Sequence, residues 1–254
     1  MSFLSSFFAN IPIYIINLND SIDRKTHILN EFKDYSSNIH FIEAVDGRDP
    51  EYFNNNYIIK YETDIDFTTA LIAVICSHAK AIYKAYHSGL DKVCIFEDDV
   101  HLDLIYNCKF TLDDVCKLNN DWETIQLFYA QNIEDNHNDY LNNGLRLIKR
   151  DSELNYSGTC YIINRNGMEK FLNNVIITDG TKNFNIIPKI IDPEAIVFNY
   201  INSYIINRIL FYYWFNSMTF NNYLITDVIN NTTKIGCQQL HLNIKNKLLE
   251  LYTE

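Results

Sequence analysis

The chain has 254 residues and a hydrophobic content of 47%, enough to bury a full core, which excludes an intrinsically disordered protein. Thirty-two acidic and 21 basic residues give a net charge of −11, which repels a phosphate backbone and argues against a nucleic-acid partner. The six cysteines show no paired metal-ligand spacing and favour a reducing, cytoplasmic location. The apolar start lacks a basic n-region, and no apolar stretch reaches the roughly 20 residues that span a bilayer. We therefore expect a soluble protein with neither a secretion signal nor a transmembrane segment.

Apolar runs of strand length alternate with helical patterns over the first 100 residues. Strands are expected at residues 11–18, 39–45 and 92–96. Helices are expected from Asp20 or Ser21 to Phe32 and from Thr68 or Thr69 to His87. Because apolar strands that alternate with helices form parallel sheets covered on both faces, the order predicts an α/β fold with a mostly parallel sheet.

The rest of the chain continues this pattern without a clear linker, so we expect a single domain over residues 1–254. Helices are predicted at 112–118 and 167–173, strands at 124–129 and 159–163, and a helical region at 193–209. The polar stretch 134–144 and the stretch 174–190 are the expected loops.

Polar residues follow each of the first three predicted strands, and the third strand runs directly into Glu97, Asp98 and Asp99. Parallel strands place their carboxyl ends at one edge of the sheet, where such folds bind ligands. On an extended backbone Glu97 and Asp99 point one way and Asp98 the other, so the outer pair could share a hard divalent cation. A solvated acidic turn is the alternative interpretation of this run.

Four blocks in this order resemble glycosyltransferase family 25: IYIINLNDSIDRK (14–25), IHFIEAVDGRD (39–49), CSHAKAIYKAYHSG (76–89) and KVCIFEDDV (92–100). A fifth block, YSGTCYIINRNGMEKFL (156–172), is similar to a later element of the family. The family includes bacterial lipooligosaccharide galactosyltransferases, procollagen galactosyltransferases and giant-virus relatives. The resemblance implies a GT-A, Rossmann-like fold, a UDP-sugar donor, and a manganese or magnesium ion at the acidic run. It also implies that residues 1–130 bind the nucleotide sugar and 131–254 the acceptor.

The resemblance also assigns site residues, position by position. Glu97 and Asp99 match the metal motif, and the residues expected at the nucleotide sugar are Asn17, Leu18, Arg24, Asp46, Gly47, Ser77, His78 and Asp98. Purely structural roles remain open for three of them: Arg24 as a surface helix residue, Asp46 as a turn former and His78 as a core histidine.

The expected activity is metal-dependent transfer of a hexose, galactose or glucose, from a UDP-sugar to a hydroxyl of a glycan or protein, with inversion. Such transfer needs a general base, for which Asp192 is the candidate and Glu194 the second choice. Asp192 could instead be a helix cap before Pro193. Acceptors of the collagen or lipopolysaccharide kind are implied by the relatives, and a viral member would work in the host cytoplasm or the virion.

Two departures from the family pattern keep other functions open. The family usually has Gly-Glu-x-Gly-Cys before Ser77, where this chain has Ala-Leu-Ile-Ala-Val at 70–74, and Asn19 stands where an acidic residue is common. A degenerate member that binds a glycan or a partner is the second hypothesis. An unrelated nucleotidyl or phosphoryl transfer enzyme is the third, although no glycine-rich phosphate loop supports it.

Overall fold

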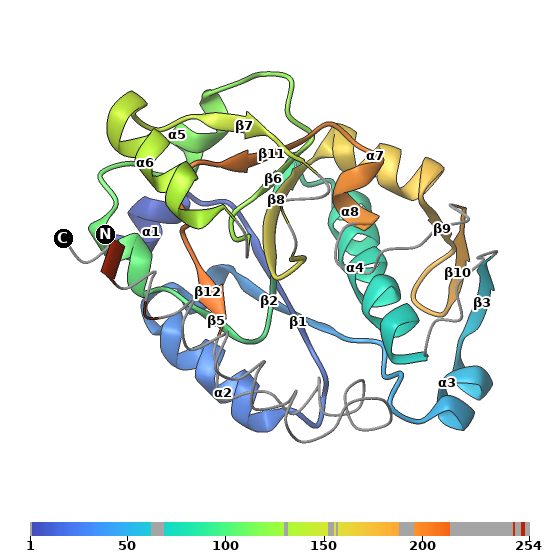
Figure 1. Cartoon of the computed structure of the whole chain (residues 1–254). Coiled ribbons are helices and arrows are strands. Elements are labelled where there is room, and N and C mark those ends of the chain that lie inside the picture. The colour runs from blue at the N-terminus through green and yellow to red at the C-terminus, as the bar shows by residue number, and fades with distance from the viewer. Residues whose placement is uncertain are drawn as a thin grey trace, which may run out of the picture.

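The computed structural model describes residues 2–61, 69–129, 132–151, 155, 157–187, 196–213, 246, 250 and 251. A seven-stranded sheet in the order β2-β1-β4-β8-β6-β11-β7 forms its centre (Figure 1). Its strands are β1 (Ile13–Asn17), β2 (Ile39–Glu43), β4 (Lys92–Glu97), β6 (Thr124–Gln126), β7 (Leu147–Lys149), β8 (Cys160–Asn164) and β11 (Ser203–Ile206). Two small sheets accompany it, formed by β3 (Ile58–Tyr61), β10 (Asn183–Ile186) and β9 (Ile176–Thr178), and by β5 (Val100–His101) and β12 (Tyr212–Tyr213).

The central sheet is mixed but largely parallel. β1 pairs in parallel with both β2 and β4, and β6 pairs in parallel with β11. β8 is antiparallel to both β4 and β6, so those two strands run the same way, and β7 is antiparallel to β11. Five of the seven strands therefore share one direction. This arrangement confirms the α/β, GT-A-like fold class that the sequence predicted.

Helices cover both faces of this sheet. The α-helices are α1 (Phe3–Phe8), α2 (Ile22–Glu31), α3 (Pro50–Asn56), α4 (Thr69–His87), α5 (Leu112–Lys117), α6 (Ile133–Asn143), α7 (Arg165–Asn174) and α8 (Ile196–Asn199). Short 3₁₀ helices lie at Lys33–Asn38 and Asp103–Asn107. In β1, Ile13 and Ile15 face the core under α1, α2 and α5, whereas Tyr14 and Ile16 face the core under α4, α7 and α8. Alternation along a strand that is buried on both faces produces these two cores.

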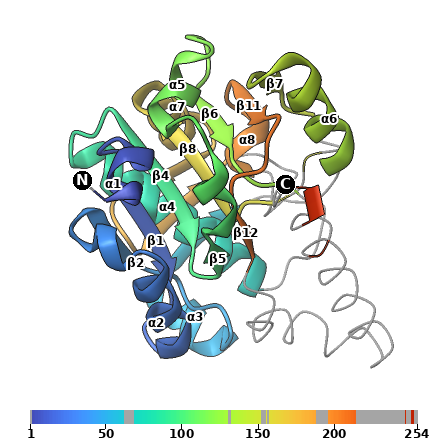
Figure 2. The same ribbon diagram turned by 90° about the vertical axis from the view of Figure 1, so that its left-hand side faces the viewer.

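Helix α1, near the start of the chain, packs into the first of these cores. Leu4, Phe7 and Phe8 of α1 are buried, and the Phe8 ring stacks on Tyr35 with 5.2 Å between centroids. Figure 2 shows α1 beside β1 and β4, with α2 beyond them. The apolar start of the chain is therefore core helix followed by core strand.

The stretch 134–144 was expected as a loop, and this prediction is wrong. It lies in helix α6, which ends at Gly144 with a φ of 76°. Ile133 and His137, one turn apart, are buried, and Asp139 accepts a hydrogen bond from Asn207, 68 residues later in the chain. Long-range contacts stabilise a helix whose asparagine-rich composition does not favour one.

The interpretation of 174–190 as a loop is also wrong in its described part. It contains β9 and β10, whose Ile176, Phe184 and Ile186 are buried. β10 pairs in parallel with β3, more than 100 residues earlier in the chain. This small sheet lies beyond α4, next to α3 (Figure 1). Its strands are short, and their long-range pairing is not visible as local periodicity.

The helical region expected at 193–209 is confirmed for residues 196–199, which form α8, and is wrong for residues 200–209. The single turn of α8 gives way to strand β11, whose Ser203, Ile205 and Ile206 are buried between β6 and β7. A short apolar run that is buried on all sides has no periodicity that separates strand from helix.

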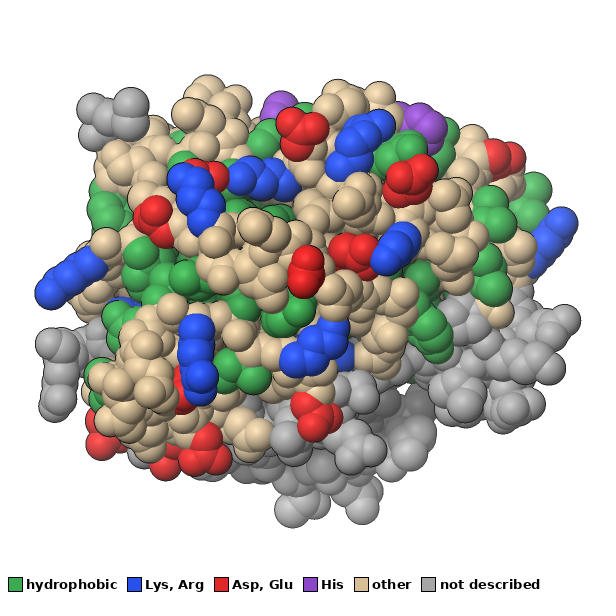
Figure 3. Space-filling model, turned by 90° about the horizontal axis from the view of Figure 1, so that it is seen from above, with side chains coloured by type: hydrophobic (Ala, Val, Ile, Leu, Met, Phe, Trp, Pro, Cys, Tyr) green, Lys and Arg blue, Asp and Glu red, His purple; other side chains and the backbone are tan. Residues whose placement is uncertain are grey.

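None of the described helices is long and apolar enough to cross a membrane. On the face shown in Figure 3, acidic and basic side chains are interspersed rather than segregated by sign.

Candidate active site

The carboxyl ends of three parallel strands meet at one edge of the central sheet. β1 lies between β2 and β4, with Asn17 opposite Glu43 and Ile16 opposite Glu97. The polar residues that follow these strands therefore lie along one edge, as the sequence predicted. In open α/β sheets this edge is where ligands bind.

Arg24 joins the two aspartates of the acidic run. Its Nη1 lies 2.6 Å from Asp98 Oδ1, and its Nη2 lies 2.5 Å from Asp99 Oδ2. None of the three side chains is more than 15% exposed. Because β4 ends at Glu97 and a turn follows, strand alternation no longer holds there. The opposite orientation expected for Asp98 and Asp99 does not occur, since both contact one guanidinium.

Asp98 is the most deeply buried member of the run. Burial raises the pKa of its carboxyl, although the charge of Arg24 and the hydrogen bond from Asn17 favour the ionised form. Asn17 Nδ2 donates to Asp98 Oδ2 at 2.6 Å and to the Ser21 carbonyl at 3.3 Å. The run has no basic neighbour in sequence, but Arg24 supplies one in space. Charge balance alone therefore does not require a metal ion here.

Glu97 contacts a separate set of residues. His78 Nε2 lies 3.4 Å from Glu97 Oε1, and the Tyr161 hydroxyl lies 3.0 Å from Nδ1 of the same ring. His78 and Tyr161 are buried, while the Glu97 side chain is 33% exposed. The Glu97 N–H donates to the Thr159 carbonyl at 2.8 Å. Glu97 is thus held in place on its inner side and open to solvent on the other.

The chemistry of these carboxylates suits a hard divalent cation. Mg²⁺ and Mn²⁺ prefer oxygen donors, and Glu97 and Asp99, two residues apart in the sequence, offer carboxylate oxygens. Glu97 is accessible from solvent, and Asp99 Oδ2 is already held by Arg24. The residues present therefore fit the ion that the sequence predicts, with Asp99 shared between that ion and Arg24.

Asp46 and Gly47 follow β2 and lie against the start of α4. A Cβ atom on Gly47 would stand 2.4 Å from the Thr69 carbonyl oxygen and 2.6 Å from Ala73 Cβ, so no larger residue fits. The Asp46 carboxylate accepts from Arg48 Nε at 2.8 Å and Nη2 at 2.5 Å, and these hydrogen bonds lower its pKa. The local hydrogen bond from Arg48 N–H to Asp46 Oδ1 is typical of a turn former.

Ser77 and Leu18 are buried in the supporting structure. The Ser77 hydroxyl donates to the Ala73 carbonyl at 2.7 Å and accepts from the Val45 N–H at 2.8 Å, which ties α4 to the end of β2. Leu18 is buried, and its carbonyl accepts from the Ser21 N–H where the chain turns into α2. The side chains of Glu97 and Asp46, by contrast, are 33% and 29% exposed at this edge.

Asp192 and Glu194, the candidates for the general base, lie outside the described residues. At the start of α4, where the family pattern has a carboxylate, the described first turn carries no acidic residue.

Sequence reasoning missed Arg48 and Tyr161 as members of this site. Arg48 lies in the block at 39–49, and its charge two residues after Asp46 could have indicated that the two side chains pair. Arg48 Nη2 also lies 2.7 Å from Asp20 Oδ2. Tyr161 lies on β8, and only the antiparallel pairing of β8 with β4 brings its hydroxyl to His78.

Comparison with known proteins agrees with this geometry. Residues 10–179 match the family described as glycosyltransferase family 25 (LPS biosynthesis protein). Among curated proteins, none matches the chain. The matched region includes β1, β2, β4 and β8, and with them every contact of Arg24, His78 and Asp46 given above.

Proposed function

The chain belongs to glycosyltransferase family 25 and is therefore a glycosyltransferase, and from this premise we propose a metal-dependent, inverting transfer of a hexose from a UDP-sugar. The acceptor in this proposal is a hydroxyl of a glycan or a protein. Galactose and glucose are the proposed sugars.

One observation carries the proposal: accessible carboxylates meet an arginine at the carboxyl edge of parallel strands. Glu97, the last residue of strand β4, is held by His78, and Asp99, two residues later, is held by Arg24. A nucleoside diphosphate needs positive charge for its phosphates, and carboxylates alone would repel it. A hard cation on Glu97 and Asp99 would reverse that repulsion and stabilise the charge of the departing diphosphate.

Other residues of this edge act as positioning groups in the proposed mechanism. Tyr161 orients the His78 ring, and the ring in turn fixes Glu97. Asn17 and Arg24 fix the turn at Asp98, so this carboxylate stays within the protein rather than facing the ligand. Arg48, with a side chain 30% exposed, is the cation best placed to meet a phosphate from solvent.

The first experiment measures UDP binding by calorimetry with and without Mn²⁺. Addition of the ion should tighten binding at least about tenfold in the wild type, and Asp99→Ala should lose this gain. Asp135→Ala, which removes an exposed carboxylate on α6, is the matched control and should keep it. Equal UDP binding with and without Mn²⁺ in the wild type would contradict the metal-dependent proposal.

The second experiment identifies the general base. If Asp192 is the base, Asp192→Asn should lower turnover by about 10² to 10⁴ while UDP binding and melting temperature hold. Asparagine caps a helix nearly as well as aspartate, so an unchanged turnover would assign Asp192 to capping. Glu194→Gln is the parallel variant, and loss of turnover in it alone would move the role to Glu194.

A second candidate function is that of a degenerate member that binds a glycan or a partner. The absence of an acidic residue from the described first turn of α4, where the family pattern has one, favours it. Metal-dependent UDP binding without transfer to any acceptor, and without hydrolysis of any nucleotide sugar in a panel, would support this second function over catalysis.

A further inference from the structure

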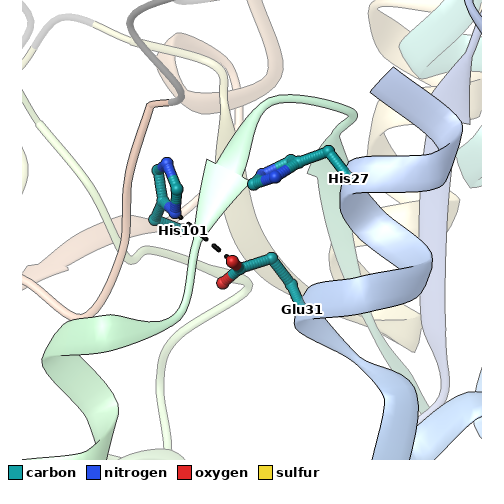
Figure 4. Close-up of side chains that lie close together, drawn as sticks. All are labelled: His27, Glu31 and His101. Carbon is teal, nitrogen blue, oxygen red and sulfur yellow. Dashed lines mark ion pairs between the residues drawn. The ribbon is translucent and has the colours of Figure 1, made fainter. Parts of the chain in front are cut away.

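A second group of candidate ligands lies between α2 and β5. His27 and Glu31 stand one turn apart on the same face of α2, and His101 projects toward them from β5 (Figure 4). One candidate ligand atom from each of the three side chains lies within 4.8 Å of those of the other two. Within the described part of the chain, only these three residues form a group of at least three His, Cys, Asp or Glu side chains whose candidate ligand atoms all lie within 4.8 Å of one another.

The spacing within this group already approaches that of a coordination sphere. His101 Nδ1 lies 3.4 Å from Glu31 Oε1. Two ligand atoms with bonds of about 2.1 Å to a tetrahedral ion lie roughly 3.4 Å apart, so His101 Nδ1 and Glu31 Oε1 already have the spacing that such an ion needs. The His27 and His101 ring centroids are 4.8 Å apart at an angle of 73°, so the His27 ring lies beside the other two ligands.

Neighbouring groups hold Glu31 and His27 by the atoms that a metal ion would not use. The Leu102 N–H donates to Glu31 Oε2 at 2.8 Å, which leaves Oε1 directed at His101. His27 Nε2 donates to the Val100 carbonyl at 2.8 Å, so Nδ1 is the ring nitrogen that would coordinate the ion. A hydrogen bond from the second ring nitrogen to a backbone carbonyl is the usual support of a metal-bound histidine. The Tyr212 ring stacks on His101 at 5.0 Å and 23° and limits its rotation.

We propose that His27, Glu31 and His101 bind one zinc ion, which joins α2 to β5. Two imidazoles and a carboxylate are a ligand set that zinc uses, whereas Mg²⁺ and Ca²⁺ prefer oxygen ligands alone. All three side chains are partly buried, so water reaches the site and can complete the coordination.

This site is separate from the acidic run but adjoins it on both of its elements. Arg24, which holds Asp98 and Asp99, lies one turn before His27 on α2. His101 follows Asp99 by two residues. An ion that ties His27 and Glu31 to His101 therefore fixes the helix that carries Arg24 against the chain that carries its aspartates. Its role is to stabilise the shape of the active site, and the ion takes no part in sugar transfer.

Cobalt(II) is a suitable probe, since it occupies zinc sites and colours strongly in four-coordinate surroundings. The full chain, stripped with a chelator, should bind one equivalent of Co²⁺ with an intense visible absorption that one equivalent of Zn²⁺ abolishes. His27→Gln and His101→Gln should each weaken binding at least about tenfold, the effect of losing one ligand. His87→Gln, at an exposed histidine on α4, is the matched control and should keep the full signal. Zn²⁺ should raise the melting temperature of the wild type but not of His101→Gln, and the circular dichroism of the metal-free variants should show that they fold.

Three results would overturn the inference. One is the absence of stoichiometric Co²⁺ binding to the wild type below about 100 μM. Another is an unchanged signal in His101→Gln and His27→Gln. The third is loss of the signal in Asp99→Asn together with its retention in His101→Gln, which would locate the ion at the acidic run.

Discussion

Arg24 and Arg48 each join two aspartates along the same edge of the sheet, yet their surroundings differ. The pairs of Arg24 with Asp98 and Asp99 have side chains exposed by 15% or less. Arg48 and its partner Asp46 are about twice as exposed, and its other partner Asp20 is 61% exposed. A buried charge that loses its partner costs more free energy than an exposed one, because water screens the attraction within an exposed ion pair. The buried pair of Arg24 and Asp98 should therefore stabilise the fold, whereas Arg48 should remain available to a ligand.

The largest effect is expected from Arg24→Ala. It would leave Asp98, which is 4% exposed, without its cation, and we expect a loss of about 3 kcal/mol in the free energy of unfolding. Urea denaturation measures this loss. Arg24→Lys keeps the charge but not the two-pronged geometry, and it should lose less. A loss below about 1 kcal/mol in the free energy of unfolding of Arg24→Ala would mean that the buried ion pairs of Arg24 stabilise the fold no more than the exposed ion pairs of Arg48.

Gly47→Ala should come next and would show that the region around Arg48 has a rigid backbone despite its exposed charges. The new methyl group would meet backbone and side-chain atoms of α4 at less than 3 Å. Overpacking of this kind costs about 1–3 kcal/mol, again measured by urea denaturation. An unchanged urea midpoint would indicate that the start of α4 can move to make room for the methyl group. The backbone around Arg48 would then not be rigid.

The two clusters should also respond to acid in opposite directions. Arg48 lowers the pKa of Asp46, so this group stabilises the fold above the ordinary aspartate pKa near 4 and loses that contribution as pH falls through its lowered value. Burial raises the pKa of Asp98, so its charged form opposes folding at neutral pH, and this penalty disappears as pH falls through the raised value toward about 4.

Unfolding free energies between pH 3 and 7 for the wild type, Asp46→Asn and Asp98→Asn would test this difference. Relative to Asp98→Asn, the wild type should gain stability from neutral pH down to about 4. Relative to Asp46→Asn, it should lose stability below about 4. Parallel curves for either pair would show that the folded protein does not shift that pKa.

The smallest effect is expected from Arg48→Ala. An exposed ion pair contributes about 0.2–1 kcal/mol, and added salt should reduce even this difference. Denaturation at low and high ionic strength provides the measurement. A loss of more than about 2 kcal/mol in the free energy of unfolding that does not depend on salt would show that Arg48 behaves like the buried Arg24.

Sequence alone determined the parallel half of the fold and the family. The runs that became β1 and β4 are continuous and apolar, β2 contains three apolar residues, and α4 begins at Thr69 and ends at His87 as predicted. Such signals lie within one element, so a single sequence can carry them. The acidic run at the end of β4 and the ordered blocks around it led to the glycosyltransferase assignment for the same reason.

Only the tertiary structure decided which charges meet. Arg24 reaches Asp98 and Asp99 across more than 70 residues, Tyr161 reaches His78 across 83, and His101 reaches Glu31 from a separate strand. Strand β10 pairs with β3, strand β11 pairs with β6, and Asp139 of helix α6 binds Asn207, and each of these partners is far away in the chain. Contacts of this kind depend on the order of the strands and the placement of the helices, and local sequence periodicity predicts neither.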